Sequence, residues 1–139
     1  MLVRLYINLF YFMRVFFAVI LIFLGFISPT ASFASHIELS DCVEIAHCVR
    51  EEWEVSAIEN PFKEIKEIIE TTPRSKIVEL NEDYLHAEIT SKWMKYVDDL
   101  EISFVPETSK LIVRSESRVG ESDLGVNQKR VDLLKSKLF

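Results

Sequence analysis

The chain has 139 residues, enough for one domain, and carries a formal net charge of −6. This charge is unevenly placed. The first 34 residues hold two arginines and no acids, so the remainder carries 14 basic against 22 acidic residues, a net charge of about −8. A chain this acidic is repelled by phosphate backbones and by anionic membrane surfaces. The composition therefore argues against nucleic-acid binding, and it leaves the N-terminal segment as the sole membrane-directed part.

Residues 1–34 have the features of a secretory signal. An apolar run from Val15 to Ile27 follows Arg14, and Ser32-Phe33-Ala34 places small residues at both positions that a signal peptidase reads. We predict cleavage after Ala34 and export. The alternative is an uncleaved membrane anchor, because the mostly apolar stretch that begins at Leu5 is long enough to span a bilayer.

Cys42 and Cys48 are the two cysteines of the chain, and they lie in the segment 35–52 that follows the leader. In an oxidising compartment an even cysteine count at short spacing favours a disulfide. The alternatives are free or intermolecular thiols, or metal or redox chemistry that also uses His47. Because the spacing lacks the paired CxxC geometry of a zinc site, we predict no metal and no cofactor.

Residues 53–139 predict an α+β domain. Trp53–Ile58 alternates as a first strand, and Asn60-Pro61 then indicates a helix start with Asn60 as N-cap. Pro73 ends this helix, since the residue before a proline is disfavoured in helical geometry, and residues 77–80 read as a strand. The apolar face of the helix comprises Phe62, Ile65, Ile68, Ile69 and Thr72.

Three further strands, at residues 84–90, 99–104 and 111–118, alternate apolar and polar side chains, so the sheet has one apolar and one charged face. A last helix starts either at Ser122 or at Asn127, and its buried stripe comprises Leu124, Val131, Leu134 and Leu138. We predict a mainly antiparallel sheet in the order β-α-β-β-β-β-α, with both helices on the apolar face. The apolar positions are Leu85, Ala87, Ile89, Leu100, Ile102, Phe104, Leu111 and Val113.

The stretch Arg114–Arg130, with the sequence RSESRVGESDLGVNQKR, is the densest polar segment and the best candidate site. Arg114 and Arg118, with backbone donors of the following loop and helix start, have the chemistry to bind a small anion. The alternative is cross-strand ion pairing with acids of the same sheet face. The candidate ligand-binding residues are Asp99, Arg114, Arg118, Ser122, Asp123, Asn127 and Arg130.

Ser115 and Ser117 have the parity of the apolar face, so their hydroxyls need partners, which Asn127 or Asp123 could supply. Trp53, Trp93, Met94 and Tyr96 are expected to close the core or its rim, and an aromatic-lined lipid pocket is the alternative.

Three segments, YLHAE, YVDDLE and VRSESRVGESDLGVNQKR, resemble the domain of unknown function 1499 family, whose pattern is roughly YxxAE, FVDDVE and RSxSRxGxSDxGxNxxR. The cysteine pair followed by Val49 is also similar to that family. The chain departs from it at Val43–His47, at Arg50-Glu51 and at Glu121. The resemblance implies no assigned reaction. It implies an exported or envelope protein, and hence the periplasm or the thylakoid lumen.

The preferred hypothesis is a non-catalytic exported binding or accessory protein that engages a small anion or an envelope protein partner. A hydrolase or transferase that uses His86, Asp98, Asp99 and Asp123 is the alternative from another class. Asp98 and Asp99 are adjacent on a strand and point to opposite faces, which argues against a shared-proton dyad. A third possibility is a purely structural polar motif with function elsewhere.

Overall fold

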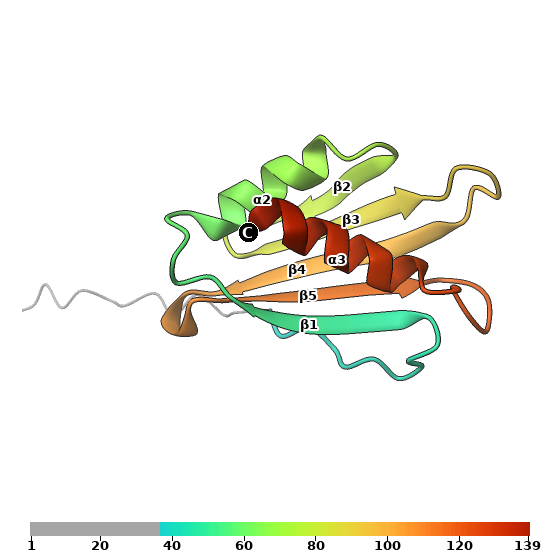
Figure 1. Ribbon diagram of the computed structural model, residues 1–139, viewed down its shortest axis with the longest axis horizontal. Coiled ribbons are helices and arrows are strands. Elements are labelled where there is room, and N and C mark those ends of the chain that lie inside the picture. Colours follow the sequence, from blue (N-terminus) through green and yellow to red (C-terminus); the bar gives the residue numbers. More distant parts are fainter. Residues whose placement is uncertain (1–36) are drawn as a thin grey trace, which may run out of the picture. The chain divides into compact units, whose positions relative to one another are not determined.

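The computed structural model describes residues 37–139, so the leader predicted over residues 1–34 lies outside the described residues. An antiparallel five-stranded sheet carries two helices on one face (Figure 1). This confirms the α+β prediction and the order β-α-β-β-β-β-α. In sheet order the strands are β1 (Cys48–Glu54), β5 (Lys110–Ser117), β4 (Val97–Val105), β3 (Tyr84–Thr90) and β2 (Ser75–Leu80). The helices are α2 (Pro61–Glu70) and α3 (Val126–Leu138), and a 3-10 turn, Pro106–Thr108, joins β4 to β5.

The first strand lies earlier in the chain than predicted. It runs along the whole of β5, from Cys48 opposite Glu116 to Glu54 opposite Lys110, so the prediction of a strand at Trp53–Ile58 is wrong. The chain turns directly after β1, where the Ile58 amide donates to the Val55 carbonyl at 3.0 Å. The bounds of β1 are set by its pairing with β5, and the alternation of side chains along one segment does not predict such pairing.

Helix α2 begins where its signals place it. Pro61 is its first residue, and the Asn60 side chain accepts a hydrogen bond from the Lys63 amide at 3.4 Å. The helix ends at Glu70, so Thr72 lies beyond it. Ile65 and Ile69 are fully buried against the sheet, as expected of the apolar face.

The strand parity is confirmed. The inner face of the sheet, meaning the face beneath the helices, carries the buried side chains, which pack against α2, α3 and Trp53. The outer face is charged in its central part. At one end, however, Leu39 packs on Tyr84 and Ile112, and the Ser103 hydroxyl donates to the Ile37 carbonyl at 2.7 Å. The fully buried inner residues of the strands include Leu85, Ala87, Leu100, Ile102, Leu111 and Val113.

Helix α3 begins at Val126, so both predicted starts, at Ser122 and at Asn127, are wrong. Leu124 and Gly125 adopt left-handed φ values of 53° and 75°, which interrupts helical geometry just before Val126. The prediction that Leu124 belongs to the buried stripe is wrong for the same reason, since Leu124 lies in the loop and is 87% exposed. The rest of the stripe, Val131, Leu134 and Leu138, is buried.

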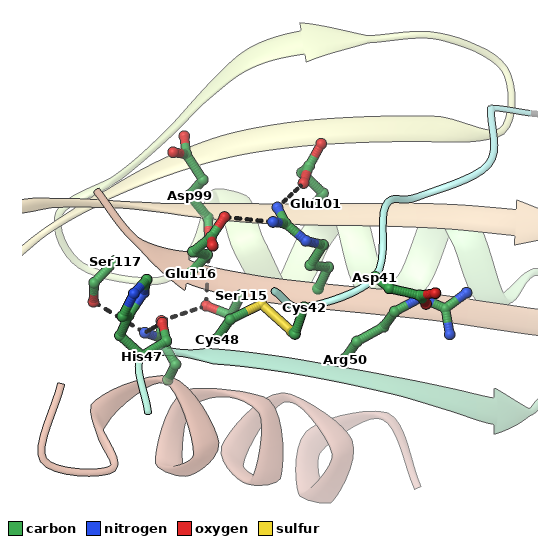
Figure 2. The surroundings of a disulfide bond; sticks show 12 residues. Asp41, Cys42, His47, Cys48, Arg50, Asp99, Glu101, Ser115, Glu116 and Ser117 are labelled. Carbon is green, nitrogen blue, oxygen red and sulfur yellow. Dashed lines mark hydrogen bonds and ion pairs between the residues drawn. A yellow bond between two sulfur atoms is a disulfide. The ribbon is translucent and has the colours of Figure 1, made fainter. Parts of the chain in front are cut away.

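Cys42 and Cys48 form the predicted disulfide, which joins residue 42 to the first residue of β1 (Figure 2). Such a bridge indicates an oxidising environment outside the cytosol. Between residues 37 and 139, no helix has the length and apolar character needed to span a membrane.

Candidate functional site

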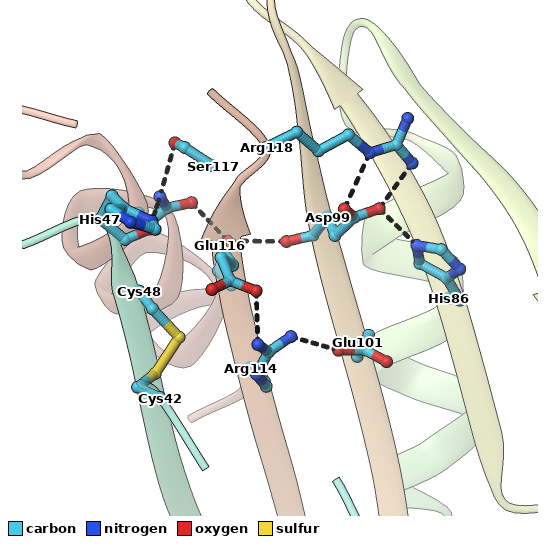
Figure 3. Close-up of polar contacts among 12 residues, drawn as sticks. Cys42, His47, Cys48, His86, Asp99, Glu101, Arg114, Glu116, Ser117 and Arg118 are labelled. Carbon is cyan, nitrogen blue, oxygen red and sulfur yellow. Dashed lines mark hydrogen bonds and ion pairs between the residues drawn. A yellow bond between two sulfur atoms is a disulfide. The ribbon is translucent and has the colours of Figure 1, made fainter. Parts of the chain in front are cut away.

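Arg118 and Asp99 form the central ion pair of the outer face (Figure 3). The guanidinium donates from Nε to Asp99 Oδ2 at 2.8 Å and from Nη2 to Oδ1 at 2.7 Å, and it also reaches Glu88 at 2.8 Å. His86 Nε2 lies 2.6 Å from Asp99 Oδ1. The hydrogen bonds from Arg118 and then His86 hold the pKa of Asp99 below its usual range, despite partial burial.

A second outer-face group surrounds Arg114. Its Nη1 donates to Glu101 Oε2 at 2.8 Å, and its Nη2 donates to Glu116. Burial alone would lower the pKa of Arg114, but the hydrogen bond to Glu101 and the charges of Glu116 and Glu101 outweigh it and raise the pKa. The contact with Glu101 is a cross-strand ion pair of the kind that the sequence offered as the alternative to anion binding, whereas Glu116 lies on the same strand as Arg114.

Asn127 is the centre of a buried network on the inner face. Its Oδ1 accepts hydrogen bonds from the Ser115 hydroxyl at 2.7 Å and from Arg130. Its Nδ2 donates to the His47 carbonyl at 2.9 Å and to Ser117 Oγ at 3.0 Å. One amide therefore joins β5, α3 and the disulfide segment, and the predicted partnership of both serines with Asn127 is confirmed.

Arg130 extends this network to β4. Its Nη1 donates to the Ser115 hydroxyl oxygen at 2.7 Å, and its Nη2 donates to Asp98 Oδ2 at 2.6 Å. The side chains of Arg130 and Asp98 are 14% and 9% exposed, so this ion pair is largely removed from water. A pair of this kind strongly penalises loss of either partner.

Asp123 caps helix α3 from the preceding loop. Its Oδ1 accepts from the Gly125 amide at 2.9 Å, and its Oδ2 accepts from the Asn127 amide at 2.7 Å. Burial would raise the pKa of Asp123, but these backbone hydrogen bonds outweigh it and lower the pKa. The Asp123 amide in turn donates to the Ala46 carbonyl at 3.2 Å, so the loop is attached to the disulfide segment as well.

The seven predicted ligand-binding residues do not form one cluster. Three lie on the outer face, Asn127 and Arg130 lie on the inner face beneath α3, and Ser122 and Asp123 lie in the loop between β5 and α3. The outer three are Asp99, Arg114 and Arg118.

The residues of the enzymatic alternative are equally dispersed. Asp98 pairs with Arg130 on the inner face, Asp99 contacts His86 on the outer face, and Asp123 caps a helix. Within residues 37–139, no three His, Cys, Asp or Glu side chains are grouped so that they could hold a metal ion.

A pocket of about 580 Å³ lies at the end of the sheet where β4 begins and β5 ends. We call it the sheet-end pocket. Two loops form it, residues 91–96 between β3 and β4 and residues 118–125 between β5 and α3, and both loops lie at the same end of the sheet in Figure 1. Its apolar rim consists of Trp93, Met94, Tyr96, Val119, Leu124 and Val126, all of which are exposed.

Polar side chains form the floor of this pocket. Asp98, Ser117 and Asp123 all line it, and each is tied to the buried network or to the cap of α3. The Lys92 ammonium lies 5.0 Å from the centre of the Trp93 ring at the rim. Two other hollows, along α2, are lined mainly by charged side chains such as Glu64 and Glu67 and offer little apolar surface.

Trp93, Met94 and Tyr96 were expected to close the core or its rim, but they lie in a loop outside the sheet, and Trp93 is 81% exposed. Their place in the lining of the sheet-end pocket is closer to the alternative of an aromatic-lined pocket. Trp53, by contrast, is buried as expected. The signal that could have located the rim is the position of the three residues between two alternating strands, in a segment without alternation of its own.

A protein-family model described as "Protein of unknown function (DUF1499)" matches residues 37–138. The chain belongs to the DUF1499 family. The match spans every strand and helix described above, so this family assignment covers the whole α+β domain. Comparison with curated proteins gives no significant match.

The motif on which the DUF1499 resemblance rests therefore has two structural roles. Ser115, Asn127 and Arg130 build the buried network, and Asp123 caps α3. The intervening positions, among them Val119 and Leu124, contribute the exposed rim of the sheet-end pocket.

Proposed function

We propose that this DUF1499 protein is a non-catalytic binding protein that holds a small molecule in the sheet-end pocket. The observation that carries the proposal is the combination of an exposed apolar rim with a rigidly held polar floor. Ligand pockets of this size are typically lined by apolar and aromatic side chains with a few fixed polar groups. Exposed apolar side chains gathered at one place on a small protein are also typical of an interaction site.

The distribution of the acids supports binding over catalysis. A hydrolase or transferase would need a base and a nucleophile within reach of one reacting atom. Asp98 and Asp123 both line the sheet-end pocket, but they take part in a buried ion pair and a helix cap, and Asp99 pairs with Arg118 on the outer face. His86 contacts Asp99, away from the pocket floor.

Export is the second part of the proposal. The disulfide fits an oxidising compartment, and the sequence of residues 1–34 supplies a candidate secretory signal. The periplasm and the thylakoid lumen are the compartments that the family resemblance suggests. In either place the protein would act on molecules that reach the envelope or the lumen.

A thermal-shift experiment tests the binding site. Small molecules extracted from the protein's own compartment, freed of macromolecules by filtration, should raise the melting temperature of the wild type. Leu124→Gln should abolish the shift, because Leu124 belongs to the rim and is exposed. Leu133→Gln, an equally conservative change at an exposed position on α3 outside the pocket, should leave the shift intact. Stabilisation by the macromolecular fraction alone would point to a protein partner instead.

A small-anion site on the outer face is the second candidate. Arg50 and Arg114 lie directly opposite each other on β1 and β5, and the buried Nε of each has no hydrogen-bond partner within residues 37–139, although Arg50 Nε forms an ion pair with the exposed Asp41 carboxylate at 3.6 Å. Arg118, whose side chain is 42% exposed, is the neighbouring accessible cation. An anion there would compete with the carboxylates of Asp99, Glu101 and Glu116.

Inorganic phosphate is the probe for this second candidate. If the outer face binds anions, phosphate should raise the melting temperature of the wild type more than chloride at equal ionic strength, and Arg118→Ala should remove the difference. Equal effects of the two salts would exclude the anion site and leave the sheet-end pocket as the sole candidate of the two.

A further inference from the structure

We propose that the occupant of the sheet-end pocket is a molecule with a flat apolar body and a hydrogen-bond donor head, an ammonium or a hydroxyl group, which binds Asp98 Oδ1. This inference rests on the proposed function and specifies the chemistry of its ligand. It is carried by one carboxylate oxygen, Asp98 Oδ1, that lines the pocket and makes no hydrogen bond within residues 37–139, beside a second carboxylate that is fully engaged.

Asp98 supplies that acceptor. The residue is 6% exposed, and it lines the pocket. Its Oδ2 accepts from Arg130 at 2.6 Å, whereas Oδ1 makes no hydrogen bond within residues 37–139. Oδ1 is not among the buried polar atoms that lack a partner, so it retains access to solvent, and a donor that enters the pocket can reach it. The Arg130 contact also fixes the orientation of the carboxylate, so Oδ1 is held in place for a ligand.

The second carboxylate of the floor is already engaged. Asp123 uses both carboxylate oxygens for backbone amides of the α3 cap. Ser117 Oγ accepts from Asn127 Nδ2 and keeps a hydroxyl proton and a second lone pair for a ligand. A head group that enters the floor thus meets one free carboxylate oxygen and one hydroxyl.

The charges around the pocket disfavour an anionic head. Asp98 and Asp123 both lie in the floor, while the Lys92 ammonium lies at the rim over the Trp93 ring. A carboxylate head would approach Asp98 Oδ1 without a proton to share, and like charges at hydrogen-bond distance repel. A hydroxyl or an ammonium head supplies the proton, and the ammonium adds charge assistance.

The rim defines the body of the ligand. Trp93 and Tyr96 offer flat aromatic faces, and Met94 offers a flexible side chain that adapts to planar rings. Val119 and Leu124 on the second loop, and Val126 at the start of α3, supply the rest of the apolar rim. A planar apolar body between the two loops would remove side chains of both from water.

Three probes that share a naphthalene body and differ in the head group test the proposal. They are the amine 1-naphthylmethylamine, the alcohol 1-naphthalenemethanol and the carboxylate 1-naphthaleneacetate. They are titrated into the purified protein, and binding is followed by the two tryptophan indole N–H signals in a nitrogen–proton correlation spectrum. We expect the Trp93 signal to shift and the buried Trp53 signal to stay in place. The amine and the alcohol should each bind roughly tenfold more tightly than the carboxylate.

Two variants make the outcome decisive. Asp98→Asn should reduce the preference of the amine over the carboxylate to less than about threefold. Because this variant also weakens the pair with Arg130, the wild-type head-group order stands as an independent test. Leu124→Gln should weaken all three probes alike, and Leu133→Gln should weaken none.

The possible failures are distinguishable. Binding at Trp93 with no head-group preference, or with the carboxylate favoured, would overturn the donor-head inference and leave the pocket as a binding site. Absence of a Trp93 shift with every probe would overturn both the inference and the proposed small-molecule site.

Discussion

Asn127 places its whole side-chain amide inside the protein. Four side-chain hydrogen bonds, to Ser115, Ser117, the His47 carbonyl and Arg130, join it to β5, α3 and the disulfide segment. We predict that Asn127→Ala lowers the free energy of unfolding by about 3 kcal/mol, because it leaves Ser115, Arg130 and the His47 carbonyl without this partner. Urea unfolding measures the loss.

The neighbouring residue supplies the control for Asn127. Gln128 is exposed, and its side chain donates to Glu51 and Asp132 at the surface. Gln128→Ala should change stability by no more than about 0.5 kcal/mol. A loss below about 1 kcal/mol for Asn127→Ala would contradict the structural role of the network.

The lowered pKa of Asp99 predicts how the stability of the folded protein depends on pH. Its folded-state pKa is lowered by Arg118 and His86, so the folded protein binds fewer protons than the unfolded chain in the acid range. The stability that Asp99 contributes is therefore fully present above its unfolded pKa, near 3.9, and is lost as the pH falls through its folded pKa.

Asp99→Asn should lower stability at neutral pH and flatten the acid dependence. It should not abolish that dependence, because the pKa values of Glu51, Glu52 and Asp123 are also lowered. Urea unfolding at a series of pH values between about 2 and 7 measures the slope. An unchanged slope in the variant would show that the outer-face ion pairs carry no pH-dependent stability.

The sequence predicted the environment of the buried serines better than that of the aromatic loop. Strand parity was sufficient to direct Ser115 toward the core and to require a partner for it, and Asn127 was among the two candidates. The aromatic-lined pocket was only the alternative for Trp93, Met94 and Tyr96, because these residues have the side chains of a core. They are exposed because residues 91–96 form a loop that extends away from the sheet. The chemistry of the side chains does not predict the course of the backbone there.

At the scale of elements, the disulfide segment supports the loop before α3. The carbonyls of Ala46 and His47 accept hydrogen bonds from Asp123, Ser117 and Asn127. We predict that Cys42→Ser lowers the free energy of unfolding by about 2 kcal/mol, the value expected when a loop this short is opened. Urea unfolding of both proteins without reductant measures the difference.

Val43→Ser provides a matched control within the same loop, because Val43 is exposed and makes no contact with the core. It should leave stability unchanged within about 0.5 kcal/mol. Two reactive thiols in the native wild-type protein would refute the bridge itself.

Element boundaries divide into those that local chemistry sets and those that pairing sets. Asn60 and Pro61 place the start of α2 because capping acts within one turn. Strand β1 and helix α3 were misplaced because their bounds depend on distant partners. β5 pairs with β1 along its whole length, and a left-handed Leu124 and Gly125 are stabilised by the Asp123 cap.

At the scale of the whole molecule, residues 1–34 and the acidic remainder of the chain differ in composition, and the export hypothesis treats residues 1–34 as a cleaved leader. We predict that the protein isolated from its own compartment begins at Ser35, because signal peptidase should cleave after Ala34. N-terminal sequencing decides this. A mature chain that still contains Leu21 would support the membrane-anchor alternative.

The DUF1499 match gives the extent of the family domain, residues 37–138, but assigns no reaction to it. The motif from Arg114 to Arg130 contains residues that hold the domain together and also one part of the lining of the sheet-end pocket. Binding and stability should therefore be separable by mutation within these seventeen residues.

Native mass spectrometry of the protein purified from its own compartment tests that claim most directly. The wild type and Leu133→Gln should carry an additional mass of roughly 200–500 Da that is released on denaturation, a size suited to a pocket of this volume. Leu124→Gln should be folded, with unchanged stability, and should lack that mass. A bare wild-type protein, a bound protein chain, or an additional mass that persists in Leu124→Gln would contradict the account.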